Sequence, residues 1–294
     1  MLMAPLPVFF FPGFRHNCSM KIIVLGSGTS HGIPVVGCSC PVCKSNDPWD
    51  KRMRSSLYIE GPGGESILID AGPDFRMQAL AAGITRLDAI FLTHSHADHI
   101  HGLDDIRPLS HEKPLPIYGN AQTIAEMKER FSYVFGTVWG ADQEGGGKPK
   151  LSPFVANGPI RMGRLIFTPI PVKHGALDIL GWEVREDSGK IFLYLTDTSA
   201  VPPSSLALLG SSGLRNSRLI IIGGLRRKHH ETHFTFDEAL ETALGLGADR
   251  IYLTHICHEH PHSEIEKICQ SFRESRKLAD MDIHPAWDGM ELTL

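Results

Sequence analysis

The sequence predicts an α/β protein whose strands and helices alternate along the chain and pack in layers. Short β-branched runs bounded by Gly, Asp or Pro indicate strands at residues 21–26, 66–70, 89–93, 166–172, 191–196, 219–223 and 250–254. Helical periodicity falls between or after these runs at residues 74–82, 121–131, 236–246 and 264–277. Strands and helices mixed over the whole length are typical of a layered α/β domain.

The clearest helix signal surrounds residues 236–246. Thr235 and Glu238 have the spacing of a capping box, in which each side chain bonds to the other residue's backbone N–H. Gly247 then supplies a stop, because glycine readily adopts the left-handed conformation that ends helices.

Length and composition bound the class of protein. The chain has 294 residues, of which 42% are hydrophobic and 21% charged, with a formal net charge of -4. These values exclude a disordered chain and argue against a protein that coats nucleic acid, which needs a basic field. No apolar run approaches the ~20 residues of a spanning helix, so we expect a soluble protein with no membrane partner.

The first predicted strand sets the expected domain boundary. Met20 lies directly before it, so we expect residues 1–19 to be an extension, either disordered or a wrongly assigned start, and residues 20–294 to form one domain. The apolar run 8–14 is broken by Pro12 and Gly13 and follows no basic residue, which argues against a signal peptide. Residues 132–150 predict a long surface loop, either a functional lid or an insertion.

Four potential metal ligands crowd into residues 94–99, directly after a predicted strand. They are His94, His96, Asp98 and His99. Imidazole and carboxylate groups suit zinc, manganese or iron, and the end of a strand exposes them in a cleft. The alternative is a histidine-rich surface turn.

Three more donors, each just after a predicted strand, argue against that alternative. They are His174, Asp197 and His255. Each alone is an ordinary loop residue, but seven donors match what two neighbouring metals need if one carboxylate bridges them and each ion keeps an open position.

A second cluster contains cysteines. Six cysteines are too few for a disulfide scaffold in a chain of this size, and three of them are Cys38, Cys40 and Cys43. Three thiolates at this spacing predict a metal site in a reducing, cytoplasmic compartment, and a closed structural zinc site requires a fourth ligand. Three free cysteines in a loop are the alternative.

The H-x-H-x-D-H run with a later His, Asp and His resembles the metallo-β-lactamase superfamily from about Met20 to the C-terminus. Within it, four segments look most like the PhnP-like phosphodiesterases, which act on phosphoribosyl 1,2-cyclic phosphate. The segments are 26–30, the Cys38-x-Cys40-x-x-Cys43 loop, 70–76 and 101–105. The resemblance implies an αββα sandwich, in which two packed mixed β-sheets carry helices outside.

The resemblance also implies roles for individual residues. It assigns one ion to His94, His96 and His174, and the other to Asp98, His99 and His255, with Asp197 bridging them. His258 would complete the structural zinc site with the three cysteines.

Other polar residues leave alternatives open. By position, His233 resembles the family's histidine that contacts the substrate phosphate, where it could bind a phosphoryl oxygen or protonate a leaving alkoxide. His230 could share that work or be a surface histidine. Asp70 could orient a metal-bound histidine or form a turn, and Arg52 and Arg54 could anchor a loop or substrate.

Together these features predict a dinuclear metal-dependent phosphodiesterase with two divalent cations, manganese or zinc and alternatively iron, plus one structural zinc. The cations would lower the pKa of a bound water, whose hydroxide attacks phosphorus; we expect Asp98 and His233 to be catalytic. Small, cyclic phosphodiesters are the favoured substrates, and a homodimer stays open. The alternatives are an RNA nuclease of the tRNA 3′-processing type and a non-hydrolytic carrier resembling the pyrroloquinoline quinone pathway B protein.

Overall fold

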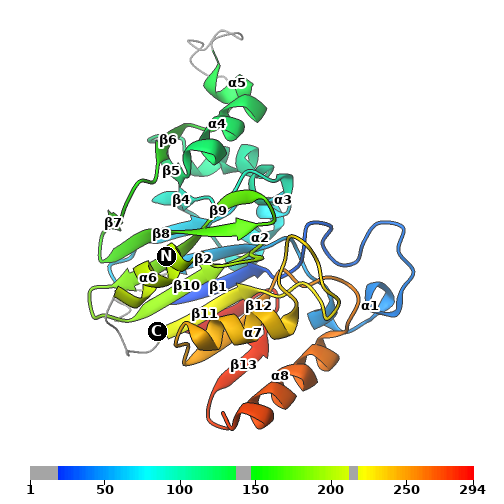
Figure 1. The fold of residues 1–294 in the computed structure, drawn as a ribbon. Coiled ribbons are helices and arrows are strands. Elements are labelled where there is room, and N and C mark those ends of the chain that lie inside the picture. The colour runs from blue at the N-terminus through cyan, green and yellow to red at the C-terminus, as the bar shows by residue number, and fades with distance from the viewer. Residues whose placement is uncertain (1–18, 137–146, 212–217) are drawn as a thin grey trace, which may run out of the picture.

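Two β-sheets lie face to face with helices on both outer sides in the computed structural model, which describes residues 19–136, 147–211 and 218–294 (Figure 1). Apart from Ser19, the predicted extension lies outside these residues. Among the described residues, no helix has both the length and the apolar character that crossing a bilayer requires.

The first sheet has seven strands: β1 (Lys21–Gly26), β2 (Ser56–Glu60), β3 (Ser66–Ile69), β4 (Ala89–Phe91), β5 (Leu115–Gly119), β6 (Leu151–Val155) and β14 (Met290–Thr293). Their order is β14-β1-β2-β3-β4-β5-β6, and β3 to β6 pair in parallel. Parallel neighbours need crossover connections. These connections contain α2 (Phe75–Ala82), α3 (Ala97–Ile100), η2 (Leu103–Leu109), α4 (Ala121–Arg130) and α5 (Ser132–Phe135).

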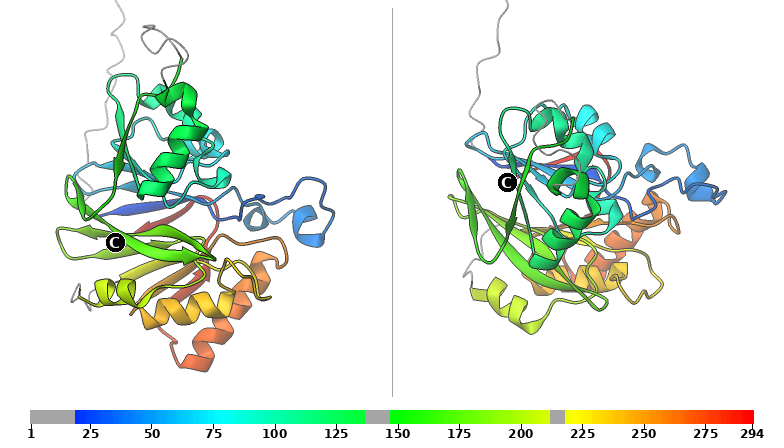
Figure 2. Two further views of the ribbon diagram at one scale, coloured as in Figure 1. Left: turned by 45° about the horizontal axis from the view of Figure 1, so that its top comes forward. Right: turned by 90° about the horizontal axis from the view of Figure 1, so that it is seen from above.

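The second sheet also has seven strands: β7 (Ile160–Met162), β8 (Leu165–His174), β9 (Leu177–Glu186), β10 (Ile191–Leu195), β11 (Arg218–Gly223), β12 (Arg250–Thr254) and β13 (Asp282–Pro285). They follow in the order β13-β12-β11-β10-β9-β8-β7, with β10 to β13 parallel. The crossovers are α6 (Pro203–Ser211), α7 (Phe236–Gly245) and α8 (His262–Arg276). Figure 2 shows these helices on the side of the second sheet that faces away from the first.

Apolar side chains between the sheets hold the sandwich together. The ring of Phe91 stacks on Phe167 at 4.0 Å and meets Trp182 edge-on at 4.9 Å. Trp182 Nε1 also donates a hydrogen bond across the sheets to the carbonyl of Leu92 at 3.2 Å. All three rings are fully buried, so apolar burial between the sheets contributes to the stability of the sandwich.

The parallel strands place their carboxyl ends at one edge of the sandwich. β8 runs in the direction of β10, because each pairs antiparallel with β9. A loop that contains α1 (Pro41–Lys44) and η1 (Pro48–Asp50) projects beside this edge (Figure 2). Ligands of open α/β sheets bind at such an edge.

Most predicted elements are present with small shifts at their ends. The capping box of Thr235 and Glu238 is confirmed, since both of its hydrogen bonds form. The predicted loop 132–150 is wrong at its start, where residues 132–135 form α5 against α4. Residues 137–146 of that loop lie outside the described residues.

Replacing Phe91 with Ala should lower the free energy of unfolding by about 3–5 kcal/mol, because the rings around it cannot fill the cavity. Phe154→Ala is the matched control: this ring in β6 is 48% exposed, and we expect a loss of roughly 1 kcal/mol. Denaturant unfolding of both variants measures the difference. Equal losses would contradict a core centred between the sheets.

Candidate metal centre

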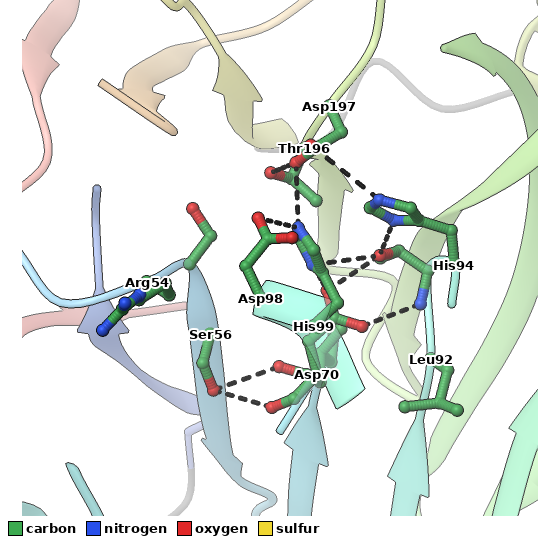
Figure 3. Close-up of polar contacts among 12 residues, drawn as sticks. Arg54, Ser56, Asp70, Leu92, His94, Asp98, His99, Thr196 and Asp197 are labelled. Carbon is green, nitrogen blue, oxygen red and sulfur yellow. Dashed lines mark hydrogen bonds and ion pairs between the residues drawn. The ribbon is translucent and has the colours of Figure 1, made fainter. Parts of the chain in front are cut away.

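Seven side chains meet at the edge where the parallel strands end. His94 and His96 follow β4, Asp98 and His99 lie on α3, His174 ends β8, and Asp197 and His255 follow β10 and β12. They come from both sheets, and Figure 3 shows four of them, His94, Asp98, His99 and Asp197, pointing toward one another. The fold thus brings together residues that are 161 positions apart in sequence, from His94 to His255.

The seven residues form two groups that could each hold a metal ion. In the first group, the candidate ligand atoms of His94, His96 and His174 all lie within 4.8 Å of one another. The second group is Asp98, His99, Asp197 and His255, with the same limit.

Asp197 lies between the two groups. Its Oδ1 is 3.3 Å from His99 Nε2 and 2.9 Å from His255 Nδ1. Its Oδ2 is 3.9 Å from His94 Nε2, on the side of the first group. One carboxylate oxygen therefore faces each group, which is the geometry that a bridging ligand needs.

Outer contacts fix the orientation of the histidine rings. His99 Nδ1 donates to Asp70 Oδ2 at 2.7 Å, and His174 Nδ1 donates to the carbonyl of Thr232 at 2.7 Å. His94 Nδ1 lies 3.0 Å from Thr93 Oγ1. A proton held on Nδ1 leaves the Nε2 lone pair free to bind a cation, as is usual for metal-binding histidines.

Asp70 lies in the turn that the sequence allowed and also contacts His99 of the cluster. It takes a left-handed backbone conformation (φ 62°) directly after β3, and its carboxylate accepts from Thr93 N, Thr93 Oγ1 and His99. Asp197 (φ 52°) and His255 (φ 56°) share this uncommon conformation. Strained backbone of this kind concentrates at functional sites.

The charges of the buried side chains in this cluster also favour a bound cation. Asp70, Asp98 and Asp197 are buried, and none of their ion pairs within the described part of the chain involves Lys or Arg. Burial disfavours a charged His99, but these three carboxylates outweigh it and raise the pKa of His99 well above its usual value. The cluster thus carries excess negative charge, and buried charge requires compensation.

One buried nitrogen supports the same conclusion. Among the described residues, His94 Nε2 makes no hydrogen bond although it is buried beside Asp197. Burial, followed by the charge of His99, lowers the pKa of His94 well below its usual value, so this nitrogen keeps its lone pair. Unpaired buried nitrogen and carboxylate oxygen together form a donor set that fits divalent metal ions.

The two histidines predicted to contact substrate lie in the loop after β11. The ring of His233 is 4.7 Å from that of His174 and 4.9 Å from that of His255. Burial, followed by the charge of His255, lowers the pKa of His233 to about 3. His230 is half-buried, with its ring 5.1 Å from that of His233 and its Nδ1 accepting from Thr232 N.

The cysteine loop meets the C-terminal part of the chain at a third group. The Sγ atoms of Cys38, Cys40 and Cys43 lie 3.4, 3.4 and 3.5 Å from His258 Nδ1. The backbone N–H of Cys43 is the main cause that lowers the pKa of Cys40 to about 6, which favours its thiolate. Three sulfur atoms around one imidazole nitrogen suit tetrahedral zinc.

Several supporting contacts were not predicted from the sequence. Ser95 donates to Glu126 of α4, and Thr29 Oγ1 and Ser55 Oγ lie 3.0 and 3.2 Å from the two ring nitrogens of His255. The short segment 26–30 was the one signal that pointed to Thr29.

Both arginines of uncertain role anchor loops. Arg52 is buried and donates to Ser27 Oγ and to the carbonyl of Ala286 at 2.7 and 2.6 Å. Arg54 pairs with Asp74 at 2.8 Å and donates to the carbonyl of Ser30.

Comparison with known proteins agrees with this geometry. The chain matches the Beta-lactamase superfamily domain over residues 65–256. A new diphosphatase from the PhnP family superposes with a TM-score of 0.79 at 36% identity, covering 94% of this chain and 97% of that one. Zinc-bound PqqB from Methylobacterium extorquens has a TM-score of 0.71 at 18% identity, with 93% and 100% covered, and shows the fold alone.

A curated relative is longer than this chain. An octanoyltransferase of Porphyromonas gingivalis is 37% identical over 275 residues, which cover 92% of this chain but 51% of the relative. The chain therefore spans about half the length of that relative.

These findings show that the chain belongs to the metallo-β-lactamase superfamily and, within it, to the PhnP family. The superfamily consists mostly of hydrolases. The resemblance inferred from the sequence is confirmed, and so is the αββα sandwich that it implied.

Gly72, in the turn after β3, has no room for a side chain. A Cβ on Gly72 would lie 2.0 Å from the carbonyl oxygen of Asp98, so Gly72→Ala forces the backbone of the ligand-bearing helix to move. We expect a loss of about 1–3 kcal/mol of unfolding free energy in denaturant titrations. Gly158→Ala, where nothing lies within 4 Å, is the control and should stay within about 0.5 kcal/mol. Equal stability of the two variants would contradict the close packing.

Proposed function

We propose that this protein is a dinuclear metal-dependent phosphodiesterase that hydrolyses small phosphodiesters. The observation that carries the proposal is the position of Asp197, with one oxygen toward each of two groups of donors. Such a pair of sites is typical of enzymes that cleave phosphate esters. The diphosphatase of the PhnP family, which also acts on phosphate groups by its name, supports the same substrate chemistry.

The donor sets define which residues would hold the ions. His94, His96 and His174 would bind one, Asp98, His99 and His255 the other, and Asp197 both. Two divalent cations, manganese, zinc or iron, would supply Lewis acidity that activates water and neutralises charge on the phosphoryl oxygens. Asp70 and the Thr232 carbonyl would keep the His99 and His174 rings aimed at the ions.

His233 would act on the substrate. Its ring lies against both groups, and among the described residues neither of its nitrogens makes a hydrogen bond. Because its pKa is lowered to about 3, the ring is neutral near pH 7, so it would donate an N–H to a phosphoryl oxygen and would not supply the proton of a general acid. His230, whose ring is next to it, would hold the far side of the phosphate.

Two other functions are less well supported. An RNA nuclease of the tRNA 3′-processing type would use the same donors, but the net charge of -4 offers little attraction to a polyanion. A non-hydrolytic carrier has no need of a complete pair of metal sites, whereas all seven donors are together here. Small, cyclic phosphodiesters are therefore the proposed substrates.

Asp98→Asn should abolish hydrolysis, because the amide replaces a charged ligand with a weak neutral one. We expect kcat for bis(p-nitrophenyl) phosphate and for 2′,3′-cyclic AMP to fall by roughly a thousandfold or more with manganese or zinc present. Asp187→Asn, a surface change away from the centre, should leave kcat unaltered. Retained turnover in Asp98→Asn would refute the proposed centre.

We also propose that Cys38, Cys40, Cys43 and His258 bind one structural zinc. Cys40→Ser should lower the metal content from about three ions per chain to about two, and the melting temperature by roughly 5 °C or more, because the loop loses its tie to His258. Elemental analysis and thermal unfolding measure both effects. Cys257→Ala, in the same segment but outside the group, should keep about three ions. Unchanged metal content in Cys40→Ser would exclude this site.

A further inference from the structure

A third group of donor atoms overlaps the two groups of the metal centre. The candidate ligand atoms of His174, Asp197 and His233 all lie within 4.8 Å of one another, the limit that also holds within each of the other groups. His174 belongs to the first group, and Asp197 lies between the two. His233 is therefore as close to these two residues as the proposed ligands are to one another, so its position allows a contact with an ion as well as with a substrate.

The spacing of the rings places His233 on the side of the first group. Its ring is 4.7 Å from that of His174, whereas the rings of His94 and His96 are 5.5 and 5.2 Å from His174. The rings of His233 and His255 are stacked at 4.9 Å, but in the described part of the chain their nitrogens share no group of donors. An ion at the first group is therefore the one that His233 can reach.

The backbone on both sides of His233 is tied to the centre. The carbonyl of Thr232 accepts from His174 Nδ1 at 2.7 Å. On the other side, Phe234 N donates to the carbonyl of Thr198 at 2.8 Å, and Thr198 directly follows Asp197. Movement of the loop away from the centre would break these bonds, so the backbone of His233 stays beside the other two members of its group.

The side chain of His233, by contrast, is not tied. Among the described residues, neither of its ring nitrogens makes a hydrogen bond, although the rings of His99 and His174 are each oriented by a bond from Nδ1. Such orienting bonds are usual for metal-binding histidines, and their loss typically costs 10- to 100-fold in metal affinity. His233 therefore has the position of a ligand without the support of a permanent one, which makes it a ligand that a competing group can displace.

We propose that His233 is a displaceable ligand of the ion at the first group. Its ring binds this ion beside the other ligands of the group when no substrate is present, and leaves it when a phosphate group enters the centre. The freed ring is then next to a phosphoryl oxygen, to which it donates its N–H. The inference rests on the dinuclear centre of the proposed function, but not on the phosphodiesterase activity.

Two variants of similar size separate binding of the ion from contact with the substrate. In His233→Gln the amide still donates an N–H but is a weak metal ligand, whereas in His233→Glu the carboxylate binds a cation but donates nothing. Competition with a chromophoric chelator measures the affinity of the metal-free protein for zinc. His233→Gln should weaken the binding of one zinc ion about tenfold, and His233→Glu should bind this ion at least as tightly as the wild-type protein.

Phosphate binding gives a second measurement with the opposite sign. In calorimetric titrations of the cobalt-loaded protein, His233→Gln should bind inorganic phosphate about threefold more tightly, because no ring has to leave the ion first. Phosphate should also change the visible absorption of the wild-type cobalt protein, and His233→Gln should differ from the wild type before phosphate is added. His229→Ala, an exposed histidine of the same loop, is the matched control and should equal the wild type in all three measurements.

The outcomes separate this inference from the proposed function. Unchanged zinc affinity in His233→Gln would overturn the displaceable ligand, since a role confined to the substrate leaves metal binding unaltered. Equal losses of zinc affinity in His233→Gln and His233→Glu would also overturn it, because the ring would then support only the structure of the loop. Absence of diester turnover by the wild-type protein, with zinc binding weakened in His233→Gln alone, would overturn the phosphodiesterase function and support the displaceable ligand.

Discussion

Three buried carboxylates, Asp70, Asp98 and Asp197, set the constraint on which the rest of this structure depends. Burial of charge without compensation costs several kcal/mol, and the contacts to His99 and His255 compensate these carboxylates only in part. Positive charge must therefore lie close to these three carboxylates, at the edge of the sandwich where strands of both sheets end. Cations bound by the surrounding imidazoles would meet this requirement, so the stability of the fold and the proposed chemistry would depend on the same residues.

The backbone around the centre is packed as tightly as its side chains. Ala71 N donates to the carbonyl of His99, and Gly102 N donates to the carbonyl of Ala71, both at 2.8 Å. A Cβ on Gly102 would lie 2.0 Å from the carbonyl of Gly72, so two glycines allow the turn after β3 to lie directly against α3. Ligand positions are thus fixed by main-chain contact between segments, and side-chain orientation is fixed by a second set of bonds such as that of Asp70 to His99.

The sequence reveals the donors better than the contacts that orient them. The residues 94–99 are recognisable because they are consecutive, and His174, Asp197 and His255 because each follows a strand, where α/β folds expose functional groups. Contacts such as Ser95 with Glu126 or Thr29 with His255 join positions 31 and 226 residues apart, and nothing in the local pattern encodes them.

Three strands that the sequence analysis did not predict contain a residue that weakens a strand pattern. β5 contains Pro116, β6 contains Pro153 and β9 contains Gly181, and each of these residues weakens a strand pattern. In β9, a Cβ on Gly181 would lie 2.3 Å from a methyl carbon of Leu195 and 2.9 Å from the carbonyl oxygen of Tyr194, so a larger residue here would force the neighbouring strand to shift. Packing between distant segments, which periodicity does not contain, therefore overrides the local signal.

The segment after β12 couples the two metal-type clusters. His255 faces Asp197, and three residues later His258 lies among the sulfur atoms of the cysteine loop. Thr29 N donates to the carbonyl of Ile256, and Ile256 N donates to the carbonyl of Ser27, so the loop after β1 is paired with this same segment. A displacement of the cysteine loop would act on His255 through both routes. The cysteine cluster would therefore support the proposed dinuclear centre, because it holds the segment that carries His255.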